Sequence, residues 1–303
     1  MNMQSNAVPD PRVDSRAVAP AAVSATRPFY WSVRRELWEY RSIYIAPLAV
    51  AGVVLFGFLI ATIGRAMATG DPAQKVAVLS EQNGFAAGLI MATAFIVGIF
   101  YSLDALHSER RDRSILFWKS LPVSDLTTVL SKASIPLVIL PLLTFSIVVV
   151  TQVIMGVMST LALWASGLAV GTLWTHWFQT SLMLLYHLVT LHVLWHAPIY
   201  AWLLLVSGWA RRLTFLWAVL PPVAIGVLEK VAFNTSHFAA FMGYRMRGPE
   251  EFDLHPHGNA AMHSLMTMDL GHFLSTPGLW IGLVVAAAFL AAAARQRRYR
   301  GPT

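Results

Sequence analysis

The sequence predicts an all-α integral membrane protein with six transmembrane helices, an N-terminal interfacial amphipathic helix and both termini in the cytoplasm. Only 12% of the 303 residues are charged, against roughly a quarter in ordinary soluble domains. Hydrophobic residues make up 56% of the chain, and they gather in blocks of the roughly 20 residues that a helix needs to cross a bilayer. A soluble surface could not be built from this composition.

The first 42 residues divide into two segments. Residues 1–27 contain prolines among small residues and no apolar block, so we expect a flexible cytoplasmic tail. Residues 28–42 place Val33, Leu37 and other apolar side chains on one helical face and Glu36 with other charges on the opposite face. This pattern predicts an amphipathic helix in the headgroup layer, where lipids are its partners.

Six spans are expected within the transmembrane domain, residues 43–294. Between Lys132 and Arg211 there is no Asp, Glu, Lys or Arg, and this uncharged stretch has room for two or three spans. If both ends face the cytoplasm, the number of crossings is even, which leaves residues 161–178 as an interfacial or re-entrant segment. The expected spans are Ile43–Ile63, Gly84–Asp104, Ile135–Met158, Thr180–Ser207, Leu213–Phe233 and Leu279–Ala294.

The basic residues predict the orientation. Of the 22 Lys and Arg residues, 17 fall on segments assigned to the cytoplasm, which include the loop 104–134 and the basic tail 295–303. The other five fall outside, three of them in or beside the long outer loop 234–277. Positive charge collects on the cytoplasmic side of membrane proteins. We therefore expect a multi-pass protein of the inner (cytoplasmic) membrane, and the net charge of +7 requires no nucleic-acid partner.

The motifs of the commoner enzyme classes do not occur in the sequence. It has no GxxxxGK[ST] loop to cradle ATP phosphates, and neither HExxH nor GxSxG. With no cysteine, thiolate chemistry is excluded as well. We expect no enzymatic activity and no cofactor in this chain.

The loop 104–134 carries the strongest functional signal. Glu109 and Arg113 have the spacing of a helical ion pair, and a short apolar helix with Trp118 is expected to end at Pro122. Ser124 is expected to be the N-cap residue of the next helix. Aromatic side chains framed by charges favour docking to a protein partner; the alternative is a basic loop whose aromatics contact headgroups. The candidate docking residues are Glu109, Arg110, Arg111, Asp112, Arg113, Ile115, Leu116, Phe117, Trp118, Lys119, Leu121 and Pro122.

The run SERRDRSILFWKSLPVSDLTTVLSK, residues 108–132, resembles the first cytoplasmic loop of permeases in the type-2 exporter family of ATP-binding cassette (ABC) transporters. The resemblance extends to Arg35-Glu36-Leu37 in the interfacial helix and to the six spans. It implies a separate ATPase subunit that binds ATP and receives the helix 113–121 as a coupling helix. It also implies a second permease half, identical or paralogous, with the substrate path between the two halves and transport by alternating access.

Other residues support alternatives. Glu229 and Lys230, at the end of the fifth span, form a possible functional pair, because charges at membrane depth commonly mark pathways. His192 and His196 could hold haem in a membrane redox protein, and a non-transporting assembly factor is a third possibility. The outer loop has side chains suited to copper, although their spacing is irregular and no metal site is assigned: His255, His257, His263 and His272.

Overall fold

The computed structural model describes residues 26–66, 72–120, 123–164, 171–248 and 270–299, and within these ranges every regular element is helical. Five helical stretches are long and apolar enough to cross a membrane. A sixth is added if two helices that meet at an angle of 45°, Ser181–Trp195 and Ala197–Trp209, count as one broken span. Each of the six expected spans overlaps one of these stretches, so the structure supports an all-helical, multi-pass membrane protein.

The helices follow one another with short connections. In chain order they are α1 (Thr26–Glu39), α2 (Ser42–Ala66), α3 (Pro72–Asp104), α4 (His107–Arg111), α5 (Ser114–Ser120), α6 (Asp125–Ser134), the π-helical turn η1 (Ile135–Ile139), α7 (Leu140–Trp164), α8 (Gly171–His187), the π-helical segment η2 (Leu188–Trp195), α9 (Ala197–Trp209), α10 (Thr214–Phe233), α11 (His237–Arg247), α13 (Leu270–Ser275) and α14 (Pro277–Tyr299).

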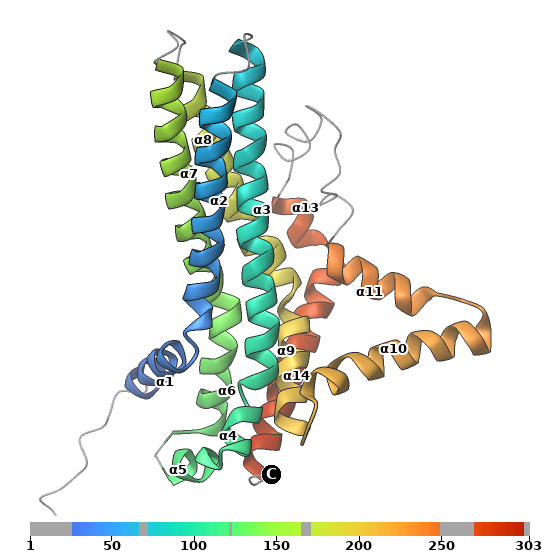
Figure 1. Ribbon diagram of the computed structural model, residues 1–303. Helices are drawn as coiled ribbons and strands as arrows, with labels where there is room; N and C mark the ends of the chain where they lie inside the picture. Colours follow the sequence, from blue (N-terminus) through green and yellow to red (C-terminus); the bar gives the residue numbers. More distant parts are fainter. Residues whose placement is uncertain (1–25, 67–71, 121–122, 165–170, 249–269, 300–303) are drawn as a thin grey trace, which may run out of the picture.

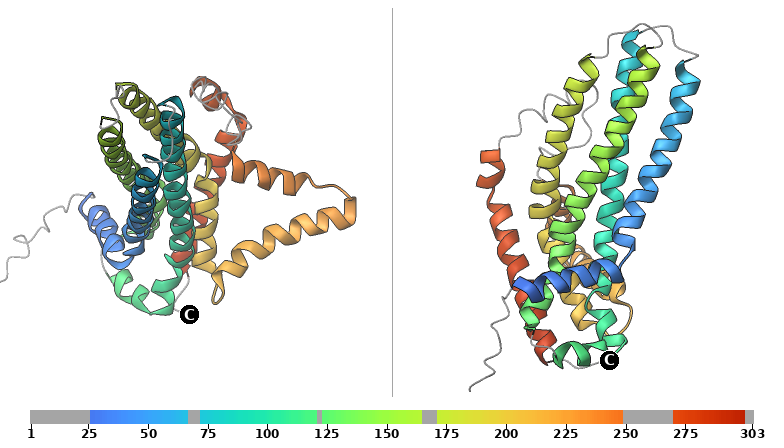
Figure 2. Two further views of the ribbon diagram at one scale, coloured as in Figure 1. Left: turned by 45° about the horizontal axis from the view of Figure 1, so that its top comes forward. Right: turned by 90° about the vertical axis from the view of Figure 1, so that its left-hand side faces the viewer.

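Helix α3 runs along the whole bundle (Figure 1). At one end it packs against α2 and α7, with α8 beside α7, and toward the other end it packs against α9, which is paired with α14. Helix α1 lies across the bundle axis (Figure 2). The loop helices α4 and α5 and the C-terminal end of α14 lie together at the end of the bundle nearer to α1.

The crossing of α3 and α9 depends on a glycine. A Cβ atom on Gly98 would lie 2.9 Å from Cε1 of Tyr200, and Tyr200 is fully buried. Just before this contact the chain changes from the π-helical η2 to α9, where Pro198 occupies the first turn. Proline cannot supply the backbone donor of a continuous helix, which explains why the expected fourth span is broken.

The segment 161–178 differs from the expectation of a separate interfacial or re-entrant element. Helix α7 continues to Trp164 and α8 begins at Gly171, so the described parts of this segment extend two neighbouring helices. At the other end of the chain, the expected basic tail is helical as far as Tyr299. The expected N-terminal tail lies outside the described residues, apart from the first residues of α1.

The expected fifth span forms a single helix, α10, but it does not run along the bundle. It projects away from α3 and α9, and α11 folds back toward the bundle (Figures 1 and 2). Leu213 has left-handed backbone geometry (φ 53°) directly before α10, which turns the chain sharply. Most of the α10 surface is exposed; Val231, for example, is 80% exposed. Hydropathy identifies such a helix correctly but carries no information about the neighbour that covers it.

Candidate functional site

The connection between α4 and α5 separates two residues that were expected to pair. Arg113 has positive φ (58°) and ends the helical course after α4, so Glu109 and Arg113 do not share one helix. Arg113 is exposed, whereas Glu109 is 2% exposed. The structure thus replaces the expected Glu109–Arg113 ion pair with contacts deeper in the protein.

Glu109 belongs to a buried ion cluster, which we define as Arg35, Glu36, Glu109, Lys132 and Arg297. Its carboxylate accepts hydrogen bonds from Arg35 (Nη2–Oε1 2.7 Å) and from Arg297 Nη1, and Lys132 Nζ lies 3.2 Å from Oε1. Glu36 accepts hydrogen bonds from Lys132 Nζ at 2.8 Å and from Arg35 Nη2 at 2.7 Å. The cluster therefore joins α1, α4, α6 and α14, which are distant in the sequence.

The charges of the cluster are compensated. Its three cations share two buried carboxylates, and two further acids extend it: Glu39 lies 3.5 Å from Arg35 and Asp125 lies 3.1 Å from Arg297. Although burial alone lowers the pKa of Arg35, Glu36 and Glu109 outweigh that effect and raise it. Removing one partner of such a group leaves the remaining buried charges uncompensated, which is far more costly than the intact group.

Tyrosines connect the cluster to α3. The Tyr101 hydroxyl donates to Glu36 Oε2 at 2.9 Å, and the Tyr40 hydroxyl donates to Asp104 Oδ2 at 3.0 Å. The two rings meet edge to face with centroids 5.0 Å apart. Burial raises the pKa of Tyr40, so its hydroxyl stays protonated and can donate at any ordinary pH. These contacts fix the turn between α1 and α2 on the end of α3.

Helix α4 is anchored to α9 by Arg110, which was expected on the docking surface. Arg110 is 5% exposed, and its Nη1 donates to the carbonyl of Gly208 at 2.8 Å. Ser207 Oγ accepts the backbone N–H groups of Leu106 and His107, both at 2.9 Å. Arg110 thus positions the loop and is not free to contact a partner.

The exposed apolar surface of α5 is formed by Leu116 and Phe117, which are 58% and 59% exposed. Trp118, the expected anchor, is half-buried: the Arg35 guanidinium lies 4.0 Å from its ring centroid. Ile115 is buried beneath the helix. Trp118 therefore ties α5 to α1 and the ion cluster, while its two neighbours face outward.

The remaining loop residues divide by exposure. Arg111 and Asp112 form an exposed pair at 3.1 Å, and the exposed Lys119 Nζ donates to the carbonyl of Arg298 at 3.4 Å. Ser124 caps α6, as expected, by accepting the Thr127 N–H at 3.0 Å. Exposed charged residues therefore lie before and after Leu116 and Phe117 in the sequence.

Sequence reasoning identified Glu109 but missed the other four cluster members, Arg35, Glu36, Lys132 and Arg297. The expected position of Glu36 opposite the apolar face is wrong: Glu36 is 1% exposed, and it is three residues after Val33 and four before Tyr40, both of which pack on the core. Lys132, 1% exposed, is the last charge before the long uncharged stretch. Arg297 carried no signal, since a basic residue near a terminus is typical of a cytoplasmic flank.

Glu229 has a local role at the tip of the α10–α11 hairpin. Its carboxylate accepts the backbone N–H groups of His237 and Phe238 at 2.8 and 2.7 Å and the Thr235 hydroxyl at 2.7 Å. It thereby satisfies free donors at the start of α11. Lys230 is exposed on the adjacent position. A functional role for Glu229 and Lys230 stays a prediction.

The two histidines near the break before α9 have protein partners. His192 Nε2 is hydrogen-bonded to the Tyr200 hydroxyl at 3.0 Å, and His196 Nε2 to the Met246 carbonyl at 3.3 Å. Within the described ranges no group of three or more His, Cys, Asp or Glu side chains could hold a metal ion. Haem binding stays an alternative that no contact favours.

We predict that Glu109→Gln destabilises the protein by about 3–5 kcal/mol, because two buried cations, Lys132 and Arg297, and the half-buried Arg35 lose a charged partner. Asp112→Asn, an exposed acid in the same loop, is the matched control and should change stability by no more than about 0.5 kcal/mol. Chemical unfolding of the purified protein in detergent, followed by circular dichroism, measures both. Equal stability of the two variants would contradict the structural importance of the cluster.

Several expectations lie outside the described residues: Leu121 and Pro122 of the loop, and His255, His257 and His263 of the outer loop. For His272 the structure describes the helix α13 but not the side chain.

Comparison with known proteins found no matching family model, no matching curated protein and no matching solved structure.

Proposed function

We propose that this chain is the membrane-spanning permease subunit of an ABC exporter of the type-2 family. In this proposal a separate ATPase subunit binds and hydrolyses ATP, and a second permease half completes the substrate path. The resemblance of residues 108–132 to the cytoplasmic loop of that family supports the proposal. The apolar helices support a membrane location. The transported substrate is unassigned.

The observation that carries the proposal is the contrast between the two sides of α5. Its outer side exposes Leu116 and Phe117, which fits a groove on a protein partner. Its inner side contacts Arg35 through Trp118. A movement of α5 would therefore be transmitted through Trp118 and Arg35 to the ion cluster, and from the cluster to α1, α6 and α14. That route would couple ATP hydrolysis to movement of the spans and so to alternating access.

The proposed orientation places α1, the loop helices and both termini in or at the cytoplasm. It is supported by the position of α1, the loop helices and the C-terminal end of α14 at one end of the bundle (Figures 1 and 2) and by the bias of Lys and Arg toward the segments assigned to the cytoplasm. Exposed Trp31 and Trp38 flank Arg34, which lies 5.2 and 4.7 Å from their ring centroids. Such amphipathic aromatics suit the headgroup layer.

The side of the membrane on which the outer loop lies tests whether the projecting helix α10 crosses the membrane. If α10 crosses the membrane, a reporter fused at Gly258 should behave as exterior, and reporters fused at Val123 and Tyr299 as cytoplasmic. The measurement is the activity of paired reporters that work on only one side of the membrane. A cytoplasmic signal at Gly258 would show that α10 does not cross and that the orientation assigned to residues 234–277 is wrong.

We predict that the double variant Leu116→Ala, Phe117→Ala weakens ATPase association at least about tenfold, because apolar anchors at an interface centre each contribute about 2 kcal/mol. Leu142→Ala is the control, since Leu142 is equally exposed (56%) but lies on α7. The measurement is ATP hydrolysis that co-purifies with the tagged protein from native membranes. Undiminished hydrolysis in the double variant would remove α5 as the coupling helix. Co-purification without any ATP hydrolysis in the wild type would favour an assembly factor.

A further inference from the structure

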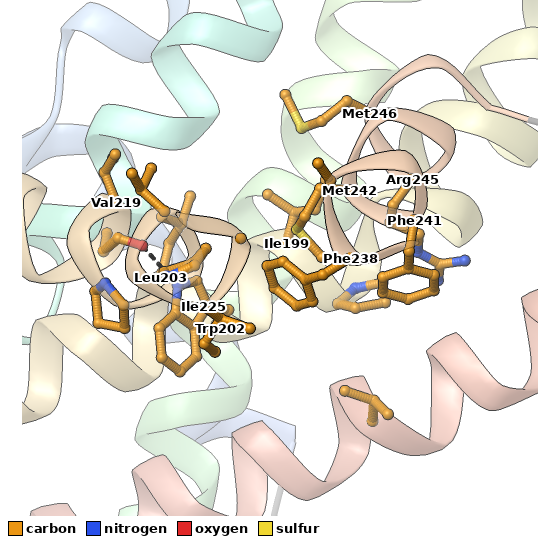
Figure 3. Close-up of a pocket in the computed structure, with 18 of the residues that line it drawn as sticks. Ile199, Trp202, Leu203, Val219, Ile225, Phe238, Phe241, Met242, Arg245 and Met246 are labelled. Carbon is orange, nitrogen blue, oxygen red and sulfur yellow. Dashed lines mark hydrogen bonds between the residues drawn. The ribbon is translucent and has the colours of Figure 1, made fainter. Parts of the chain in front are cut away.

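An apolar groove lies between the α10–α11 hairpin and the bundle (Figure 3). Its volume of ≈ 1020 Å³ is at the upper limit of ordinary small-molecule sites, which are about 300–1,000 Å³. Helices α3, α9, α10, α11 and α14 contribute its walls, with Ile199, Trp202 and Phe238 among the lining residues. The only charged side chains in this lining are two cations, Lys230 and Arg245.

Arg245 is the unusual residue of the groove. It is 6% exposed, and its guanidinium lies between the Trp195 ring, 4.4 Å from the centroid, and the glycines of α14. Nη1 donates to the Gly278 carbonyl at 3.1 Å. A Cβ atom on Gly282 would collide with the guanidinium. The Gly278/Gly282 pair thus makes room for a charged group against the helix.

The charge of Arg245 is not compensated by any described residue. No carboxylate in the described ranges forms an ion pair with it, and its buried Nη2 has no hydrogen-bond partner. Burial lowers the pKa of the guanidinium, yet an arginine stays charged in proteins. An unpaired buried cation is costly, in contrast to the paired cations of the ion cluster. The site therefore favours a ligand that brings an anion.

We propose that this groove binds one anionic phospholipid of the bilayer, with the phosphate on Arg245 and the acyl chains along the apolar walls. Nη2 lies against Gly282, so the guanidinium would turn toward the groove to form the paired hydrogen bonds that guanidinium and phosphate make. A small soluble anion would leave the walls of Ile, Val, Phe and Trp uncovered, whereas acyl chains cover them. Apolar side chains of α10 continue the same surface outside the groove. The proposal does not depend on the export function.

The test compares two lipids and four proteins. Protein in mild detergent is titrated with phosphatidylglycerol or phosphatidylcholine of identical acyl chains, and bound lipid is counted by native mass spectrometry. Wild-type protein should bind one phosphatidylglycerol at least about tenfold more tightly than phosphatidylcholine, because hydrogen bonds to charged groups are the strong ones. Arg245→Gln should lose this preference. Arg247→Gln, an exposed arginine on the same helix and outside the groove lining, should keep it.

The fourth protein separates loss of the site from loss of the fold. Val285→Trp fills the groove wall but keeps Arg245, so it should reduce binding of both lipids while its circular dichroism stays unchanged. The proposal is overturned if wild-type protein binds both lipids equally, or if Arg245→Gln or Val285→Trp binds phosphatidylglycerol as the wild type does. A wild-type dimer without bound phosphatidylglycerol would also overturn it, and would identify a second copy as the cover of the groove.

Discussion

The buried carboxylate of Glu109 is the interaction on which the architecture at this end of the molecule depends. It receives Arg35 from α1, Lys132 from α6 and Arg297 from α14. Apolar contacts hold the same helices as well: Val33 and Leu37 of α1 pack against the core cluster that contains Ala133 of α6, and Val129 of α6 lies in one buried cluster with Ala293 of α14. A buried ionic group contributes little net stability compared with apolar packing, but it specifies one geometry. Here the arrangement of the helices around the cluster determines the position of α5.

The half-buried Arg35 and the buried Arg245 have different partners for their charge. Arg35 is shared between Glu36 and Glu109, so its charge is compensated within the chain. Arg245 is held by a carbonyl, an indole ring and two glycines, none of which carries negative charge. A compensated charge suits a mechanical connection between helices. An uncompensated one suits recognition of an anion, and this difference separates the proposed coupling region from the proposed lipid groove.

Much of the fold could be predicted from the sequence, because membrane spans are specified by length and hydropathy. The helix α1 and the cap at Ser124 follow from local signals and were predicted correctly, whereas the outward face assigned to Glu36 was wrong, because Glu36 is 1% exposed. The partners of Glu109 could not be predicted, since Arg297 is 188 residues away and no periodicity links them. The spacing rule for Glu109 and Arg113 failed because a single left-handed residue interrupts the helix. The direction of α10 could not be predicted from the sequence either, because hydropathy carries no information about tertiary packing.

The central claim is that the ion cluster makes α1, α4, α6 and the end of α14 one mechanical unit. Amide hydrogen exchange of wild-type protein and Glu109→Gln in lipid nanodiscs tests it most directly. If the claim is correct, the substitution accelerates exchange together in residues 32–40, 126–134 and 292–299, while the centre of α7 is unchanged. Faster exchange confined to α4 and α5 would contradict it, because the helices would then be held by apolar packing and not by the shared carboxylate.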